Sequence, residues 1–151
     1  MSNEENVNVA YRWLQRYKPE YVEAEKESSR IKTKILHCLI KWMREYIDQH
    51  QPGLVTLNSI DYDAIPFWFG VMKYMNIDFI ENEEKDDRVY MLQMLLILRG
   101  YDCEITGNYS KFTRNKVSQF KKDYEIKRSF NSGVDWEFWY KLIYNKKEVI
   151  S

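Results

Sequence analysis

The sequence predicts a fold built almost entirely of α-helices. Apolar residues recur at the three- and four-residue intervals of a helix, and no long run alternates as an amphipathic strand does. Only 5 Gly and 3 Pro interrupt the 151 residues, of which 44% are hydrophobic, so disorder is excluded as the main state. The length fits one compact domain or two very small ones.

Two helices are expected in the N-terminal third. Val9, Trp13 and Tyr17 share one face of the first helix, which Pro19 is expected to close. Residues 31–47 carry the clearest apolar stripe of the chain, after serines that can cap a helix and before a Pro-Gly pair that stops it.

The middle of the chain is rich in turn residues and acidic groups. Asp63 can cap a third helix that runs to about Met75, and residues 54–57 form either a short strand or an extended linker. The acidic run 81–87 has the composition of a solvated linker.

Three more helices are expected in the C-terminal half. Asp86 or Asp87 can cap the first, which ends at Gly100 and is so apolar that most of its circumference must be covered. Ser110 can cap the second helix, and Asp135 can cap the third.

The charge balance bears on the class of partner. The 23 basic and 23 acidic residues cancel, which argues against a dedicated nucleic-acid binder. The charges are segregated, with a balance of −5 over residues 53–98 and +4 over residues 99–151. The basic run in the C-terminal half consists of Lys111, Arg114, Lys116, Lys121, Lys122, Lys127 and Arg128. We expect these residues to form a solvated basic face, and the next interpretation is that this face binds an acidic partner.

No stretch reaches the roughly 18 uncharged apolar residues that a membrane span needs, so no membrane partner is expected. The acidic, polar N-terminus differs from a signal peptide. The expected location is the cytoplasm, or the cell wall after release by a route that needs no signal. Cys38 and Cys103 are too few for a disulfide framework, and Cys38 is expected to be a core thiol.

No active site is visible in the sequence. His37 and His50 have no Cys or Glu partners at ligand spacing, so no metal or other cofactor is expected. Asp61 and Asp63 come nearest to a catalytic carboxylate pair, and turn and cap roles explain them better. The chain is therefore expected not to be an enzyme.

The C-terminal half contains an ordered series of motif residues. In chain order they are Leu92-Gln93, Gly100-Tyr101-Asp102, Thr106-Gly107-Asn108-Tyr109, Thr113, Val117, Phe120, Gly133-Val134, Trp139 and Leu142. Over about residues 86–144 this series resembles the peptidoglycan-binding domain of cell-wall hydrolases, a three-helix module. The resemblance implies a non-catalytic domain that binds the wall polymer.

The N-terminal half resembles a second, diverged copy of the same module. Leu14-Gln15 takes the place of Leu92-Gln93, and Thr33 follows at an interval similar to that of Thr113. The resemblance therefore implies two tandem three-helix modules, at residues 1–80 and 88–151, joined by the acidic linker.

Four residues form the candidate ligand-binding set, namely Tyr101, Asn108, Asp135 and Trp136. They lie at loop edges or helix starts, from which an aromatic face and polar groups can meet a sugar or a stem peptide. Turn chemistry and helix capping are the alternative roles for them.

Two functions follow from these observations. The first is a bacterial or phage protein that binds peptidoglycan without catalysis, or the separated targeting part of a wall hydrolase. The alternative is a cytoplasmic protein-interaction module, an adaptor or an immunity protein, on a scaffold that has lost glycan binding. The motif series favours the first. The segregated charge favours the alternative, as does the replacement of the family's glycine loop by residues 23–27.

Overall fold

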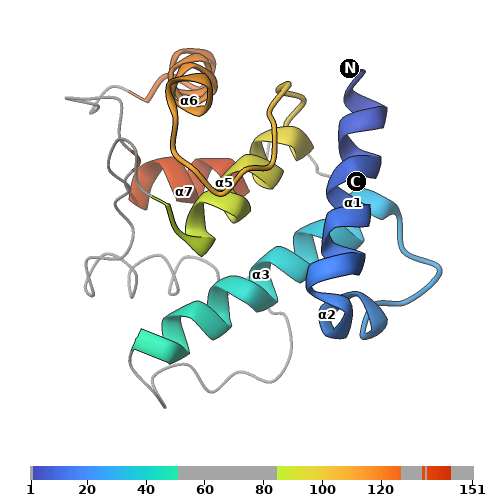
Figure 1. The fold of residues 1–151 in the computed structure, drawn as a ribbon. Helices are drawn as coiled ribbons and strands as arrows, with labels where there is room; N and C mark the ends of the chain where they lie inside the picture. Colours follow the sequence, from blue (N-terminus) through green and yellow to red (C-terminus); the bar gives the residue numbers. More distant parts are fainter. Residues whose placement is uncertain (1, 51–84, 127–133, 135, 144–151) are drawn as a thin grey trace.

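The computed structural model describes residues 2–50, 85–126, 134 and 136–143. These residues form six helices, α1 (Asn3–Tyr17), α2 (Pro19–Glu23), α3 (Ile31–His50), α5 (Asp87–Leu98), α6 (Lys111–Asp123) and α7 (Trp136–Ile143). One isolated β-bridge joins Lys85 and Asn108. The all-α prediction is confirmed for this part of the chain (Figure 1). The helix expected from Asp63 and the segment 54–57 lie outside it.

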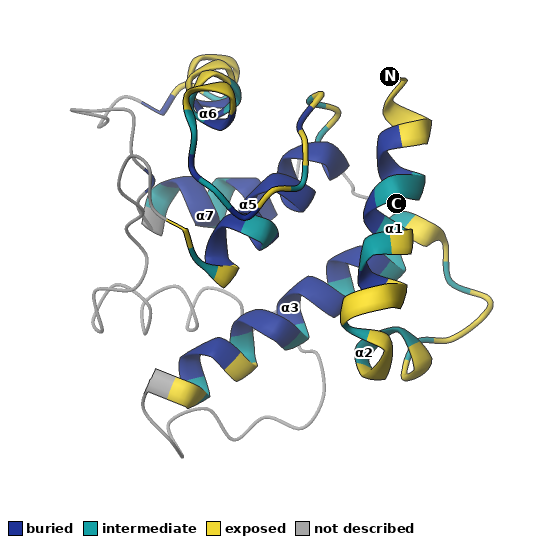
Figure 2. Ribbon diagram, in the orientation of Figure 1, coloured by how far each residue is buried: buried dark blue, intermediate teal, exposed yellow. Residues whose placement is uncertain are grey.

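The central element is α5. It contacts α1, α3, α6 and α7, and ten of its twelve residues are buried (Figures 1 and 2). A helix that is apolar on nearly every side is stable only when other elements cover it, as the sequence predicted for this segment.

One hydrophobic core extends through both halves of the chain. Leu14 and Leu39, from α1 and α3, belong to the same buried cluster as Leu95 of α5 and Trp139 of α7. Because the described halves share one core, they do not pack as separate bodies. The division into modules at 1–80 and 88–151 stays a prediction.

The positions matched in the expected repeat differ in burial. Leu14 and Leu92 are both fully buried, but Gln93 is fully buried whereas Gln15 is exposed. A buried glutamine such as Gln93 needs hydrogen-bond partners around its side chain, whereas the exposed Gln15 can bond to water. The repeat also stays a prediction, and only the leucine pair supports it.

Pro19 both ends one helix and begins another. The chain turns at Lys18, whose N–H donates to the carbonyl of Leu14 at 2.7 Å, and Pro19 then occupies the first turn of the short helix α2. The sequence analysis expected the stop but not the new helix. A proline is well suited to a first helical turn because its fixed φ is helical and its missing N–H would have no helical partner there.

Glu25 connects the loop after α2 to the face of α3. Its side chain is only 6% exposed, and its carboxylate contacts Nδ1 of His37 at 2.7 Å and the ammonium of Lys41. The buried carboxylate therefore has one charged partner, Lys41, and a second polar contact with the imidazole of His37, which together offset part of its cost of burial.

The end of the expected linker is built into the fold. Asp86 precedes α5, and its carboxylate accepts hydrogen bonds from the hydroxyl of Tyr46 at 2.8 Å and from the guanidinium of Arg88. It makes no side-chain capping bond to α5. Burial acts to raise the pKa of Asp86, but the hydrogen bonds from Arg88 and Tyr46 and the charge of Arg88 outweigh it, so the pKa is lowered.

Gln93 positions the loop between α5 and α6. Its Oε1 accepts from the N–H groups of Thr106, at 2.8 Å, and Gly107, at 3.0 Å. Its Nε2 donates to the hydroxyl oxygens of Thr106 and Thr113, both at 3.0 Å. Each bond joins α5 to the loop or to α6, so this one side chain fixes where the loop lies.

Gly107 is required at its place in this loop. Its φ is +74°, and a Cβ added there would lie 2.3 Å from Cζ of Tyr90. Gly100 also has a positive φ, of +95°, but an added Cβ would meet no atom within 4 Å. A side chain at Gly100 would therefore meet only backbone strain, whereas a side chain at Gly107 would meet backbone strain and a steric overlap with Tyr90.

We predict that Gly107→Ala destabilises the fold more than Gly100→Ala. The Gly100 change carries only the left-handed strain of about 1–2 kcal/mol, whereas the Gly107 change adds the collision with Tyr90 and reaches roughly 3 kcal/mol or more. Urea denaturation of both variants measures the difference. Equal losses would show that Tyr90 does not restrict the loop.

We also predict that Asp86 makes stability depend on pH. Because its pKa is lowered on folding, its contribution is present above the unfolded pKa of about 3.9 and is lost as the pH falls through the lower folded value. The stability difference between the wild type and Asp86→Asn should be larger at pH 6 than at pH 3 in urea denaturation. A difference that does not change with pH would contradict the assignment.

Candidate functional site

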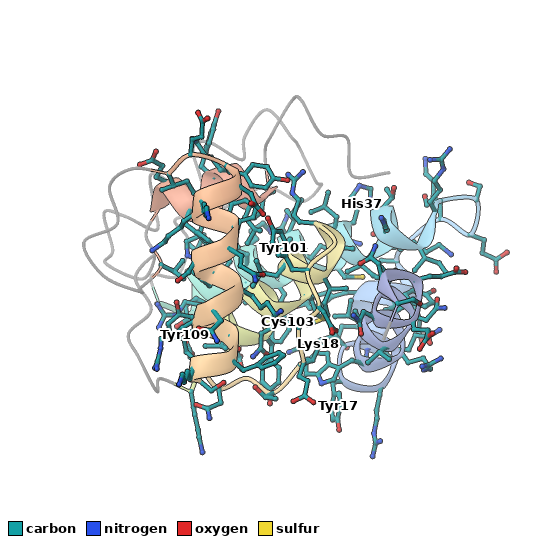
Figure 3. All side chains as sticks on the ribbon, turned by 90° about the horizontal axis from the view of Figure 1, so that it is seen from above. Tyr17, Lys18, His37, Tyr101, Cys103 and Tyr109 are labelled. Atoms are coloured by element: carbon teal, nitrogen blue, oxygen red, sulfur yellow. The ribbon has the colours of Figure 1, made fainter. Side chains whose placement is uncertain are left out.

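A cleft of about 520 Å³ opens between α1, the extended loop that follows α5, and the start of α6. Trp13 of α1 and Phe112 of α6 supply its aromatic lining, and the loop contributes Asp102, Cys103 and Glu104. Seen from above, Cys103 lies between α1 and α6 (Figure 3). The cleft is therefore formed jointly by the two halves of the chain.

The Trp13 ring is held firmly by other rings. It stacks on Trp42 with a centroid separation of 5.6 Å, and it lies 4.8 Å from the centroids of both Tyr90 and Tyr17. Neighbouring rings restrict the rotation of an indole, so little entropy is lost when a ligand meets it.

Phe112 is the more accessible of the two aromatic side chains. It is 50% exposed, and the ammonium of Lys116 lies 5.3 Å from its ring centroid. An exposed phenyl ring at the edge of a cleft presents an apolar surface that a ligand can cover.

Asp102 is positioned by a buried amide. Nδ2 of Asn6 donates to Oδ1 of Asp102 at 2.8 Å, and Asn6 is only 5% exposed. Glu104 is exposed, and no described residue forms an ion pair with its carboxylate. Among the described residues that line the cleft none is basic, so the lining carries two negative charges.

Cys103 lies in the cleft lining, but its thiol is expected to be unreactive. Burial is the main cause that raises the pKa of its thiol to about 12, and the nearby carboxylates of Asp102 and Glu104 add to it. Burial likewise raises the pKa of Cys38 to about 12. Both thiols are protonated at neutral pH, and a thiol is a poor nucleophile in that form.

The structure describes two of the four sequence-predicted site residues in full. The Tyr101 hydroxyl donates to Oδ2 of Asp123 at 2.5 Å, and its ring packs edge-on against Phe120, so it ties the loop to the end of α6. Asn108 forms the isolated bridge with Lys85, and its buried Oδ1 has no partner among the described residues.

The other two residues of the predicted set are described less fully. Asp135 lies outside the described residues, and Trp136 begins α7 with a side chain that also lies outside them. Neither Tyr101 nor Asn108 lines the cleft. The ligand-binding role of the four residues stays a prediction.

Sequence reasoning missed Trp13 and Phe112 as site residues. It placed Trp13 on a packing face, which is correct in part because the residue is half-buried. A signal for Phe112 was present, because the buried positions of α6 include Thr113, Val117 and Phe120, and Phe112 is out of phase with them. A large aromatic residue outside the buried stripe is a candidate for ligand contact.

Two further properties concern the whole described region. Within it, no three His, Cys, Asp or Glu side chains come together as a metal site would require. None of the described helices is long and apolar enough to cross a lipid bilayer.

We predict that neither cysteine reacts with a thiol reagent while the protein is folded. The raised pKa values leave almost no thiolate at pH 8, and both side chains are buried. Titration with Ellman's reagent should detect no free thiol at pH 8 and two after unfolding in urea. Rapid labelling of the native protein would contradict the assigned thiol environments.

No protein-family model matches the chain, and neither a curated protein nor a solved structure matches it significantly. The likeness to the peptidoglycan-binding domain therefore rests on the motif residues alone.

Proposed function

We propose that this protein is a non-catalytic module that binds peptidoglycan, with the cleft between α1 and α6 as its binding site. The observation that supports this proposal is the presence of two aromatic side chains, Trp13 and Phe112, beside polar groups of the loop. The apolar face of a sugar ring can cover an aromatic ring while its hydroxyls bond to the polar groups around it.

The size of the cleft agrees with a short piece of polymer. Small-molecule sites have volumes of about 300–1,000 Å³, and this cleft of 520 Å³ lies within that range. Contacts of this kind are individually weak. Their role would be to concentrate the protein, and anything attached to it, on an insoluble polymer with many equivalent sites.

The proposal is limited to binding because of the chemistry of the cleft lining. The thiol of Cys103 is held in its protonated form, and Oδ1 of Asp102 accepts a hydrogen bond from Asn6. A nucleophile with an adjacent general base is the usual signature of covalent catalysis, and the described lining contains no such pair.

The alternative function is a cytoplasmic interaction module, an adaptor or an immunity protein, with an acidic protein partner. The outer surface of α6 favours it, because Lys111 is exposed beside the exposed residue Phe112 at the start of the helix, and Lys122 is exposed near its end. A mixed basic and aromatic surface is typical of protein interfaces. On this alternative, binding would depend strongly on salt.

We predict that the purified protein co-sediments with insoluble peptidoglycan sacculi at both low and about 0.5 M salt. Phe112→Ala should weaken binding by roughly five- to tenfold, because an aromatic contact contributes about 1 kcal/mol. The matched control is Ile31→Ala, which removes a side chain that is 40% exposed and lies outside the cleft. The control should bind as the wild type does.

Three outcomes would count against the proposal. Absence of retention at either salt would overturn wall binding. Retention only at low salt would indicate a nonspecific contact through the basic face. Equal retention of the Phe112→Ala variant and the wild type would overturn the assignment of the cleft.

A further inference from the structure

We infer that the binding surface continues beyond the cleft along α1, where Arg16 binds a carboxylate of the stem peptide of the wall polymer. The inference rests on the proposed function, because it names a second group of the same polymer and the residue that recognises it. It is carried by a continuous series of contacts that leads from Trp13 in the cleft lining through Tyr17 to the guanidinium of Arg16.

Tyr17 extends the aromatic surface of the cleft. Trp13 and Tyr17 lie about one turn apart on the same face of α1, and their ring centroids are 4.8 Å apart. Tyr17 is 53% exposed and projects outward from the end of α1 (Figure 3). An exposed ring that adjoins a cleft adds apolar surface that a bound molecule can cover. The aromatic surface therefore does not end at the edge of the cleft.

The Tyr17 ring also positions the guanidinium of Arg16. Cζ of Arg16 lies 5.4 Å from the centroid of this ring, within the range of a cation–π contact. Such a contact leaves the N–H groups of a guanidinium available, and their fork matches the two oxygens of a carboxylate. The contact with the ring therefore orients Arg16 without using the donors that a carboxylate needs.

The positive charge at this end of α1 has no carboxylate partner among the described residues. Arg16 is exposed, and no described residue forms an ion pair with it. Lys18 also contacts a ring, with its ammonium 4.6 Å from the centroid of Trp42, and no described carboxylate pairs with it. Two cations held by rings and without acidic partners favour an anionic group on the ligand.

The cleft and the end of α1 differ in charge, which favours one orientation of the ligand. Asp102 and Glu104 line the cleft, so a carboxylate inside it would meet like charges. A carboxylate beside Arg16 would meet an opposite charge. The stem peptide of peptidoglycan is attached to a sugar and carries carboxylates. We therefore place the sugar in the cleft and a carboxylate of the stem peptide at Arg16.

Sacculi whose carboxylates have been converted to amides with a carbodiimide and ammonia provide the main test. Binding of the wild type should fall about fivefold relative to untreated sacculi, as expected for the loss of one exposed ion pair. Arg16→Gln should bind untreated sacculi about fivefold more weakly than the wild type. The same variant should not respond to amidation, because it already lacks the contact that amidation removes.

The matched control is Arg30→Gln. It removes another exposed arginine, which lies just before α3 and outside the cleft lining. This variant should bind untreated sacculi as the wild type does and should lose the same fivefold on amidation. A loss in Arg30→Gln equal to that in Arg16→Gln would indicate a general effect of positive charge and overturn the assignment of Arg16.

Two changes at Tyr17 test its role as a positioning residue. Tyr17→Ala removes the ring that holds Arg16 and should weaken binding about threefold, whereas Tyr17→Phe keeps the ring and should bind as the wild type does. Wild-type binding by Tyr17→Ala would overturn this role.

The source of the carboxylate is tested with sacculi from which an amidase has removed the stem peptides. The wild type and Arg16→Gln should bind these sacculi equally, because the group that distinguishes the two proteins is gone. A fivefold difference that persists would place the carboxylate on another part of the wall and overturn its assignment to the stem peptide.

The outcomes separate this inference from the proposed function. Equal binding of the wild type to amidated and untreated sacculi would overturn carboxylate recognition and leave wall binding intact. Failure of the wild type to bind untreated sacculi would overturn the proposed function and this inference together.

Discussion

The carboxamide of Gln93 is the interaction on which the rest of the site depends. It is fully buried, and its acceptor and donor atoms bond to the backbone of Gly107 and to the hydroxyls of Thr106 and Thr113. A buried amide without partners costs about 1–3 kcal/mol, so the loop and α6 are held where they satisfy it. The same loop carries Asp102, so Gln93 indirectly sets the geometry of the cleft.

The cleft owes its position to the shared core. Trp13 comes from α1 and Phe112 from α6, and α5 packs between these helices and contacts both. The hydrogen bond from Asn6 to Asp102 joins the N-terminal helix to the loop across the cleft. The proposed binding surface is a product of the joint fold, and it does not require one site in each half of the chain.

The sequence predicted the helices well because periodicity and end signals are local. The stripe from Ile31 and the apolar segment of α5 needed no knowledge of their partners. The site was harder to predict, because it depends on contacts between distant residues. Asn6 and Asp102 are 96 residues apart in the sequence, and no local sequence pattern predicts the hydrogen bond between them. No local pattern shows that the Tyr101 hydroxyl donates to Asp123, and the ligand-binding role assigned to Tyr101 stays a prediction.

We propose that the ligand binds in the cleft between α1 and α6. This can be tested by titrating the ¹⁵N-labelled protein with soluble peptidoglycan fragments and following the signals by two-dimensional NMR. The indole signal of Trp13 and the amide signals of residues 102–106 should shift together and saturate. Shifts confined to the basic surface of α6, or no shifts at all, would contradict it.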